Sequence, residues 1–329
     1  MAQARKYSPL KTLRMLSSLT DHWLAGLAFT LRSGRQTERC QALRSVFVDT
    51  LAGRIRCTDS GGVGPVILIT PDGPNVIEHC EALVARLSSS CRVICFDMPG
   101  FGFSVPTAQY SHSLEQGSAA VLAVLDNFGV DKATLAFSCA NGFYALHVAA
   151  LVPARVAGLV LSQTPSLGAM HAWTDRIVPK ALRLPVAGQV LGWLFREKAA
   201  IGWYRAALPA GTDAAPFQSV ARSALHCGAC FSLAGVVQGL LKEKRIAPNV
   251  VRTPCLLVWG SLDRSHRLTD PRSLLASVPH AELMEMFDCG HFPDLEGRHQ
   301  FADVLIERAK VWTENQGTTF KKRKVQSHG

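Results

Sequence analysis

Residues 92–104 read RVICFDMPGFGFS, and this stretch decides the fold. Residues 93–96 are all apolar, as expected of a short strand that is covered on both faces. The strand ends at Asp97, and Pro99 and Gly100 then begin a tight loop. A buried strand that runs into such a loop is typical of a parallel sheet, in which ligand sites follow the carboxyl ends of the strands.

Short apolar runs of the same kind recur on both sides of this stretch. Five of the runs show no polar alternation, which indicates strands buried on both faces. The order of strands and helices predicts an α/β fold, a doubly wound and mostly parallel sheet of eight strands. The predicted strands are 45–49, 53–59, 65–70, 92–97, 133–138, 156–162, 254–260 and 282–287, and the predicted helices are 76–88, 114–128, 140–151, 270–276 and 296–315.

The alternation is interrupted once. Between 166 and 247 no strand pattern appears, and helical pieces separated by prolines take its place. An insertion here would lie over the carboxyl ends of the strands, so we predict a helical cap over a core made of residues 45–165 and 248–315. Residues 1–44 predict an amphipathic helical leader, and the basic residues 316–329 predict a disordered tail.

Composition excludes several classes of protein. With 48% hydrophobic and 18% charged residues in 329, the chain is neither disordered nor fibrous. The net charge is +10, but the basic residues are scattered and no recognition motif appears, so nucleic acid is not expected as a partner. No apolar run is long enough to span a membrane and no secretory signal is found, which predicts a cytoplasmic protein with reduced cysteines. Cys227 and Cys230 have metal-like spacing without a second pair, so no metal site is expected.

The leader has an apolar helical face flanked by basic residues. Such a face packs on the cap, pairs with a second subunit as a homodimer, or lies at a membrane surface as a peripheral contact. Packing, equally on the cap or on a second subunit, is preferred over the membrane contact, which remains the alternative. The apolar residues are Leu13, Leu16, Trp23, Leu24, Leu27 and Leu31.

The loop after the 92–97 strand has the form D-x-P-G-x-G-x-S, and other motifs follow in a fixed order. They are the strand and loop 67–75, the strand, turn and helix 128–156, WGSLD at 259–263 and DCGHF at 288–292. In these motifs the chain resembles the α/β-hydrolase fold family from about residue 45 to 311, with the cap excepted. By itself, this resemblance implies the fold and leaves the activity to the site residues.

The family carries its nucleophile on a sharp turn between a strand and a helix, written G-x-S-x-G. Here that turn is covered by FSCANG, and two alignments compete. Cys139 at the tip matches the family without gaps but places Phe137 and Asn141 at positions that are usually small. Ser138 at the tip has small neighbours on both sides but requires two compensating gaps. The ungapped alignment favours Cys139, a cysteine in place of the family's serine, with Ser138 as the alternative nucleophile.

The resemblance also implies the other catalytic residues. His291 stands after the last strand at the family's histidine position and would act as general base. Asp263 follows the preceding strand and would orient the imidazole. For the oxyanion hole, Ala140 would supply one backbone N–H and Gly73 or Asp72 the other.

These expectations combine into one function. We expect a cofactor-independent hydrolase or acyl-transfer enzyme that acts on an ester or thioester of a mostly apolar small molecule through Cys139, His291 and Asp263. Aromatic residues of the cap suggest the apolar preference, although they could equally form the cap's own core. The alternatives are an esterase based on Ser138, and a non-hydrolytic protein of this fold that binds a ligand or performs acid–base chemistry. Because the turn carries no Asp, the sequence disfavours an epoxide hydrolase or a haloalkane dehalogenase.

Overall fold

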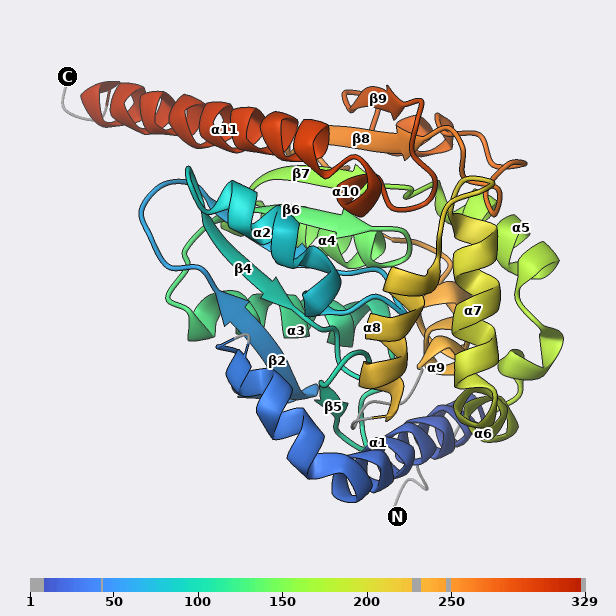
Figure 1. The fold of residues 1–329 in the computed structure, drawn as a ribbon. Coiled ribbons are helices and arrows are strands. Elements are labelled where there is room, and N and C mark those ends of the chain that lie inside the picture. Colours follow the sequence, from blue (N-terminus) through green and yellow to red (C-terminus); the bar gives the residue numbers. More distant parts are fainter. Residues whose placement is uncertain (1–8, 43, 227–231, 247–249, 327–329) are drawn as a thin grey trace, which may run out of the picture.

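The computed structural model describes residues 9–42, 44–226, 232–246 and 250–326, so that Cys227 and Cys230 lie outside the described residues. It contains one sheet with helices on both faces (Figure 1). The strands are β1 (Val46–Thr50), β2 (Gly53–Asp59), β3 (Val66–Thr70), β4 (Arg92–Phe96), β5 (Val105–Pro106), β6 (Ala133–Ser138), β7 (Val156–Ser162), β8 (Cys255–Gly260) and β9 (Glu282–Met286).

The strand order is β1-β2-β4-β3-β6-β7-β8-β9, with β5 beside β2. Pairs from β4 through β9 are parallel, and those of β2 with β1, β4 and β5 are antiparallel. The prediction of a doubly wound, mostly parallel sheet is confirmed. The sequence did not predict β5, because a strand of two residues is too short to show any periodicity.

Helices cover both faces of the sheet. The short helix α10 precedes α11, and the predicted helix at 270–276 is only a 3₁₀ turn, Ser273–Ala276. In the core, α2 and α11 pack together on one face, and α3 and α4 pack together on the other (Figure 1). These helices are α2 (Glu81–Leu87), α3 (Leu114–Asn127), α4 (Asn141–Leu151), α10 (Pro293–Glu296) and α11 (Arg298–Gln326).

The pattern of β6 explains the two layers. Leu135 and Phe137 belong to the apolar cluster that includes α3 and α4, and Ala136 between them belongs to the cluster on the other face. All six residues of β6 are buried. The strand therefore reads as apolar throughout, because both of its faces are covered.

The helix at the end of the chain differs from expectation. Helix α11 continues to Gln326, through most of the segment 316–329 that we expected to be a disordered tail. Residues 316–326 contain no proline and a single glycine, so nothing in them ends the helix.

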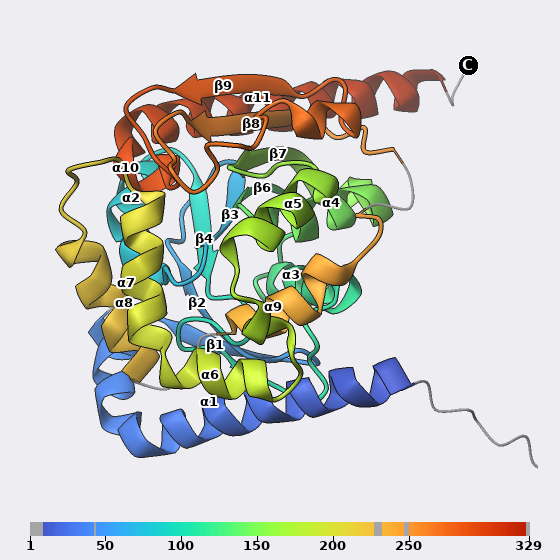
Figure 2. The ribbon, with the colours of Figure 1, turned by 90° about the vertical axis from the view of Figure 1, so that its right-hand side faces the viewer.

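Between β7 and β8, the described residues of the predicted cap, 166–226 and 232–246, contain helices and no strand. These helices lie at the end of the sheet towards which the arrowheads of the parallel strands point (Figures 1 and 2). They are α5 (Leu167–Ile177), α6 (Ala187–Leu194), α7 (Arg196–Ala207), α8 (Ala215–His226) and α9 (Leu233–Gln238). Figure 2 shows α7 beside α8 and α6 close to the first helix of the chain.

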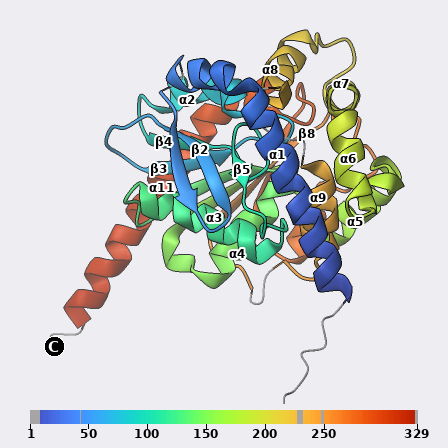
Figure 3. The same cartoon turned by 90° about the horizontal axis from the view of Figure 1, so that it is seen from below.

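The first helix, α1 (Pro9–Ala42), lies along one side of the molecule (Figure 3). Its buried residues Asp21, Ala25 and Ala28 face the body, where the helix contacts β5, α6 and α9. The carboxylate of Asp21 lies 3.7 Å from Nε2 of His112. The leader is thus packed on the fold. Within the described ranges, no helix has both the length and the apolar character needed to cross a membrane.

The stretch that decided the fold has a structural role. Asp97 is buried, and its carboxylate accepts hydrogen bonds from the backbone N–H of Ile77 at 3.1 Å and of Phe103 at 3.2 Å. Gly102 has φ of +55°, and a Cβ added there would lie 2.1 Å from this carboxyl group. The aspartate therefore ties two loops together, and the glycine leaves room for it.

Candidate active site

The strand β6 ends in a sharp turn at Cys139. This residue has φ of +51°, a left-handed conformation that is strained for a residue with a side chain, and α4 begins two residues later. Its backbone N–H donates to the carbonyl of Ser162 at 2.7 Å, and its own carbonyl accepts from Oγ1 of Thr164 at 3.0 Å. The neighbouring strand thus holds the turn from both sides.

Of the two candidate nucleophiles, the structure places Cys139 at the tip of the turn. Ser138 is the last residue of β6, where it is paired with Ser162 of β7. Cys139 lines the cavity described below, and Ser138 is not among the described residues that line it. The two side chains differ in access although both residues are buried.

Phe137 and Asn141, the two residues at positions of the turn that are usually small in the family, have different surroundings. Phe137 is fully buried in the core, where its ring meets that of Phe96 edge to face at 6.0 Å. Asn141 uses its side chain: Nδ2 donates to the carbonyl of Pro71 at 3.1 Å. This bond ties the start of α4 to the loop after β3, so Asn141 connects the two segments that would form the oxyanion hole.

The structure brings His291 and Asp263 together with Cys139. Nδ1 of His291 lies 2.6 Å from Oδ2 of Asp263, and a ring nitrogen of His291 lies within 4.8 Å of the sulfur of Cys139. All three residues are buried. Burial alone would lower the pKa of His291, but the charge of Asp263 and hydrogen bonds to its neighbours raise this pKa well above the usual value.

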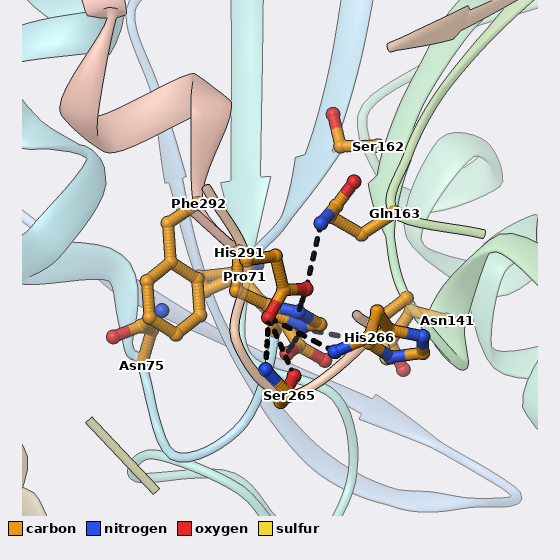
Figure 4. Close-up of polar contacts among 12 residues, drawn as sticks. Pro71, Asn75, Asn141, Ser162, Gln163, Ser265, His266, His291 and Phe292 are labelled. Carbon is orange, nitrogen blue, oxygen red and sulfur yellow. Dashed lines mark hydrogen bonds and ion pairs between the residues drawn. The ribbon is translucent and has the colours of Figure 1, made fainter. Parts of the chain in front are cut away.

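Asp263 is held by several donors. Its Oδ1 accepts from the backbone N–H and the hydroxyl of Ser265, at 2.8 and 2.7 Å, and Nε2 of Gln163 donates to Oδ2 at 2.7 Å. Burial would raise the pKa of Asp263, yet the charge of His291 and the hydrogen bonds with His291 and Ser265 keep this pKa well below its usual range. Figure 4 shows Gln163, Ser265 and His266 gathered around His291.

The side chain of Asp72 contacts the imidazole of His291, a pairing that no sequence pattern indicates. Its Oδ2 lies 3.2 Å from Nε2 of His291, so the imidazole stands between two carboxylates. Burial raises the pKa of Asp72, and the nearby imidazole opposes this rise. From the sequence, Asp72 is a possible backbone donor whose carboxylate would repel an oxyanion unless it points away or is paired. The structure pairs this carboxylate with His291, which adds a titratable group to the site.

The pKa of the Cys139 thiol is set by its burial and by these neighbours. Burial raises its pKa to about 11, the charge of Asp72 adds to the rise, and His291 and the N–H of Ala140 oppose it. The resting thiol is therefore protonated at neutral pH, and thiolate must be generated by proton transfer. Ala140, Gly73 and Asp72 all line the cavity beside Cys139, where the oxyanion-hole donors were expected.

Two further side chains support the site. Gln163 is fully buried at φ of +47°, and its Oε1 accepts from the backbone N–H of Gly260 at 3.1 Å while Nε2 holds Asp263. The imidazole of His266 lies between the rings of Trp173 and His291, at centroid distances of 4.9 and 5.3 Å. No motif in the sequence singled out either residue.

One group of described residues could hold a metal ion. One ligand atom each from Cys139, His266 and His291 lies within 4.8 Å of the others, and all three residues are buried. Within the described part of the chain, Nε2 of His266 has no hydrogen-bond partner. Sulfur and imidazole ligands suit zinc. No sequence motif indicates this group, because its three residues are far apart along the chain.

A cavity of about 340 Å³ lies between the cap and the sheet above Cys139. At its floor are the polar residues Asp72, Cys139 and Asn141. The rest of its described lining is apolar or glycine, and no Lys, Arg or His belongs to it. This part of the lining is Gly73, Phe101, Ala140, Met170, Trp173, Ile177, Val178, Pro179, Leu182, Ala199, Gly202, Trp203, Ala206, Leu233, Val236 and Leu241.

The cap covers the proposed reaction centre directly. The ring of Trp203 from α7 meets that of His291 edge to face at 4.8 Å. Trp203 also lines the cavity. A buried imidazole under an indole ring is shielded from bulk water, and charge–charge interactions are stronger in such a setting. The arrangement can transfer protons between Cys139, His291 and the two carboxylates beside an apolar chamber.

Comparison with known proteins gives the family. A sequence model described as "Alpha/beta hydrolase family" matches residues 77–304. The chain is 24% identical over 288 residues to 2-hydroxy-6-oxononadienedioate/2-hydroxy-6-oxononatrienedioate hydrolase of Paraburkholderia phymatum, covering 81% of this chain and 96% of that protein. It is 29% identical over 264 residues to the dihydrolipoyllysine-residue acetyltransferase component of the acetoin cleaving system of Pseudomonas putida, covering 78% and 67%.

Solved structures support the same fold. The enol-lactonase from Burkholderia xenovorans has a TM-score of 0.63 at 18% identity, covering 80% of this chain and 99% of that one. Epoxide hydrolase A from Mycobacterium thermoresistibile has a TM-score of 0.67 at 16% identity, covering 80% and 97%. At these identities the likeness concerns the fold alone.

Proposed function

Because the chain belongs to the alpha/beta hydrolase family, we propose that it is a cofactor-independent hydrolase or acyl-transfer enzyme that cleaves an ester or thioester of a mostly apolar small molecule. One observation carries this proposal. Cys139 stands at a strained turn at the floor of an apolar cavity, its sulfur lies within 4.8 Å of a ring nitrogen of His291, and Nδ1 of that ring is bound to Asp263.

In the proposed mechanism His291 accepts the thiol proton as the sulfur of Cys139 attacks the carbonyl carbon. Nε2 must first be free of its own proton, and the Asp72 carboxylate at 3.2 Å can accept it. The developing oxyanion would be stabilised by the N–H of Ala140 and of Gly73 or Asp72. The leaving group departs with a proton from the imidazolium. Water, or another acceptor, then attacks the acyl-cysteine and restores the thiol.

The lining of the cavity supports the proposal that the substrate carries an uncharged, apolar acyl group. The volume of the cavity is near the lower end of the range for small-molecule sites, and no basic residue of its described lining could pair with a carboxylate. The relative from Paraburkholderia phymatum is named for a dienedioate. We propose that this chain prefers neutral esters instead.

The nucleophile is tested by Cys139→Ala, with Ser138→Ala as the matched change one residue away. We expect Cys139→Ala to abolish turnover of p-nitrophenyl butyrate and iodoacetamide labelling of the site, measured by peptide mass spectrometry. We expect Ser138→Ala to retain both. Loss of turnover with Ser138→Ala alone would identify the serine as the nucleophile.

The contact between Asp72 and His291 favours a second candidate, acid–base chemistry without a covalent step. A pair of a carboxyl group and an imidazole at the floor of a cavity can move a proton on a bound substrate. In that case Cys139→Ala would keep its activity, whereas Asp72→Asn and His291→Ala would each remove it. Cys139→Ala therefore separates the two candidates, because His291→Ala and Asp72→Asn would impair both mechanisms.

A further inference from the structure

Two neighbouring elements expose large apolar side chains on their outer surfaces. On α1 the exposed residues Leu13, Leu16, Trp23, Leu27 and Leu31 recur at spacings that place them on one side of the helix. The buried residues Asp21, Ala25 and Ala28 hold another side of α1 against the body. Among the residues that the structure describes, the exposed stripe is therefore not used for packing, and Trp23 is 73% exposed.

The cap exposes further apolar side chains near α1. Helices α1 and α6 are in contact, and Figure 3, seen from below, shows α6 next to α1. Val190 and Leu194 are exposed on one side of α6, opposite its buried residues. We call the combined surface the α1–α6 face. Its cap residues are Ile177, Leu184, Val186, Val190, Leu194 and Phe195, and its leader residues are Leu13, Leu16, Trp23, Leu27 and Leu31.

Basic side chains accompany the apolar ones on the cap. Arg176, Lys180 and Lys198 are exposed in the same segment. Nζ of Lys198 lies 5.8 Å from the centre of the Phe195 ring. The acidic residues nearby are engaged by other cations, Asp175 by Arg183 at 2.6 Å and Glu197 by Arg222 at 3.3 Å. The whole chain has a net charge of +10. This face therefore suits a partner with an anionic surface layer over an apolar interior.

The cavity meets this face. Ile177 lines the cavity and is also 44% exposed, and Val178, Pro179 and Leu182 of the same segment line it as well. An apolar ligand could pass from the outer surface into the cavity without crossing polar side chains of this segment.

We propose that the α1–α6 face docks on the surface of an anionic phospholipid bilayer. The apolar stripe would enter the boundary between headgroups and acyl chains, while Arg176, Lys180 and Lys198 would contact lipid phosphates or carboxylates. An apolar surface of this extent is otherwise a cost to a chain exposed to water. The docking rests on these surface residues; that the bilayer also delivers an apolar substrate rests in addition on the proposed function.

The test is sedimentation of the full chain with vesicles of phosphatidylcholine, with and without phosphatidylserine. We expect binding to the anionic vesicles that weakens as salt increases. Trp23→Glu and Leu194→Glu, made on separate helices, should each weaken binding roughly tenfold. The matched control is Phe287→Glu, because Phe287 is 72% exposed and follows β9, on the opposite side of the molecule from α1 in Figure 1.

Three outcomes would overturn the proposal: no binding of the unaltered chain to anionic vesicles, equal binding by all three variants, or a concentration-dependent dimer that Trp23→Glu dissociates. The last result would assign the face to a second copy of the chain. Circular dichroism spectra and melting curves of the variants identify any loss of folding. Vesicle binding does not require turnover, so failure of the docking is distinguishable from failure of the proposed chemistry.

Discussion

Oδ2 of Asp72 lies 3.2 Å from Nε2 of His291. Since Asp263 binds Nδ1 of the same ring at 2.6 Å, the imidazole is held by a carboxylate at each nitrogen. This arrangement affects Cys139. The imidazolium of His291 pairs with the Asp72 carboxylate, so it does not need the thiolate of Cys139 as its counterion. The negative charge of Asp72 also opposes ionisation of the thiol.

We therefore predict that Asp72→Asn lowers the pKa of Cys139 from its value of about 11. The reason is that the substitution removes a negative charge next to the forming thiolate. Iodoacetamide should alkylate Cys139 faster at pH 8 in the variant, and the rise of the rate with pH should shift to lower pH. Asp288→Asn is the control, because it removes an equal charge from an exposed position in the loop that carries His291. A rate at pH 8 that is unchanged or lower in Asp72→Asn would contradict this interpretation.

Gln163 is expected to act as a positioning residue. Gln163→Leu removes the donor to Asp263 and leaves the N–H of Gly260 without its acceptor. We expect a lower kcat, an altered pH profile of kcat, and a loss of about 1–3 kcal/mol of stability. The control is Gln189→Leu, which breaks the buried pair of Gln189 with Gln238 in the cap. This control should reduce stability without shifting the pH profile of kcat. Equal pH profiles of kcat in the two variants would show that Gln163 has only a structural role.

Zinc is expected to inhibit the enzyme reversibly. Cys139, His266 and His291 present their ligand atoms within 4.8 Å of one another, and binding would occupy both the thiol and the imidazole. Turnover should fall on addition of Zn²⁺ and return with a chelator, and competition with a chromophoric chelator measures the affinity directly. His266→Phe keeps a ring between Trp173 and His291 but removes a ligand, so it should bind zinc more weakly. Equal zinc affinity in His266→Phe would show that His266 is not a ligand.

Gly102→Ala tests the loop that decided the fold. A Cβ there would lie 2.1 Å from the carboxyl group of Asp97 in a left-handed conformation. Gly129→Ala is the matched control, since Gly129 has φ of +62° and no atom of a described residue within 4 Å of its added Cβ. Urea unfolding should show a loss of about 1–2 kcal/mol for Gly129→Ala from backbone strain alone. Gly102→Ala should lower the free energy of unfolding by about 1–3 kcal/mol more than Gly129→Ala, because the clash with Asp97 is added to the backbone strain. Equal losses would mean that the Asp97 carboxyl group moves aside without cost.

The prediction of a hydrolase is confirmed at the level of the family, and the doubly wound sheet at the level of the structure. Both followed from local patterns. Apolar runs without alternation reported strands covered on two faces, as in β6, and the loop after Asp97 has a recognisable sequence because a buried carboxylate and a close glycine are both required there.

The sequence by itself determined the order of the elements and drew attention to Cys139, Asp263 and His291, because each follows a strand with a recognisable local pattern. Only the tertiary structure decided that the side chains of Asp72, Gln163 and His266 share one site with them. These groups come from loops after β3, β7 and β8, and they meet because parallel strands end at a common edge. Spacing along the chain contains no information about that meeting, since it depends on the order of strands across the sheet and not on their order in sequence.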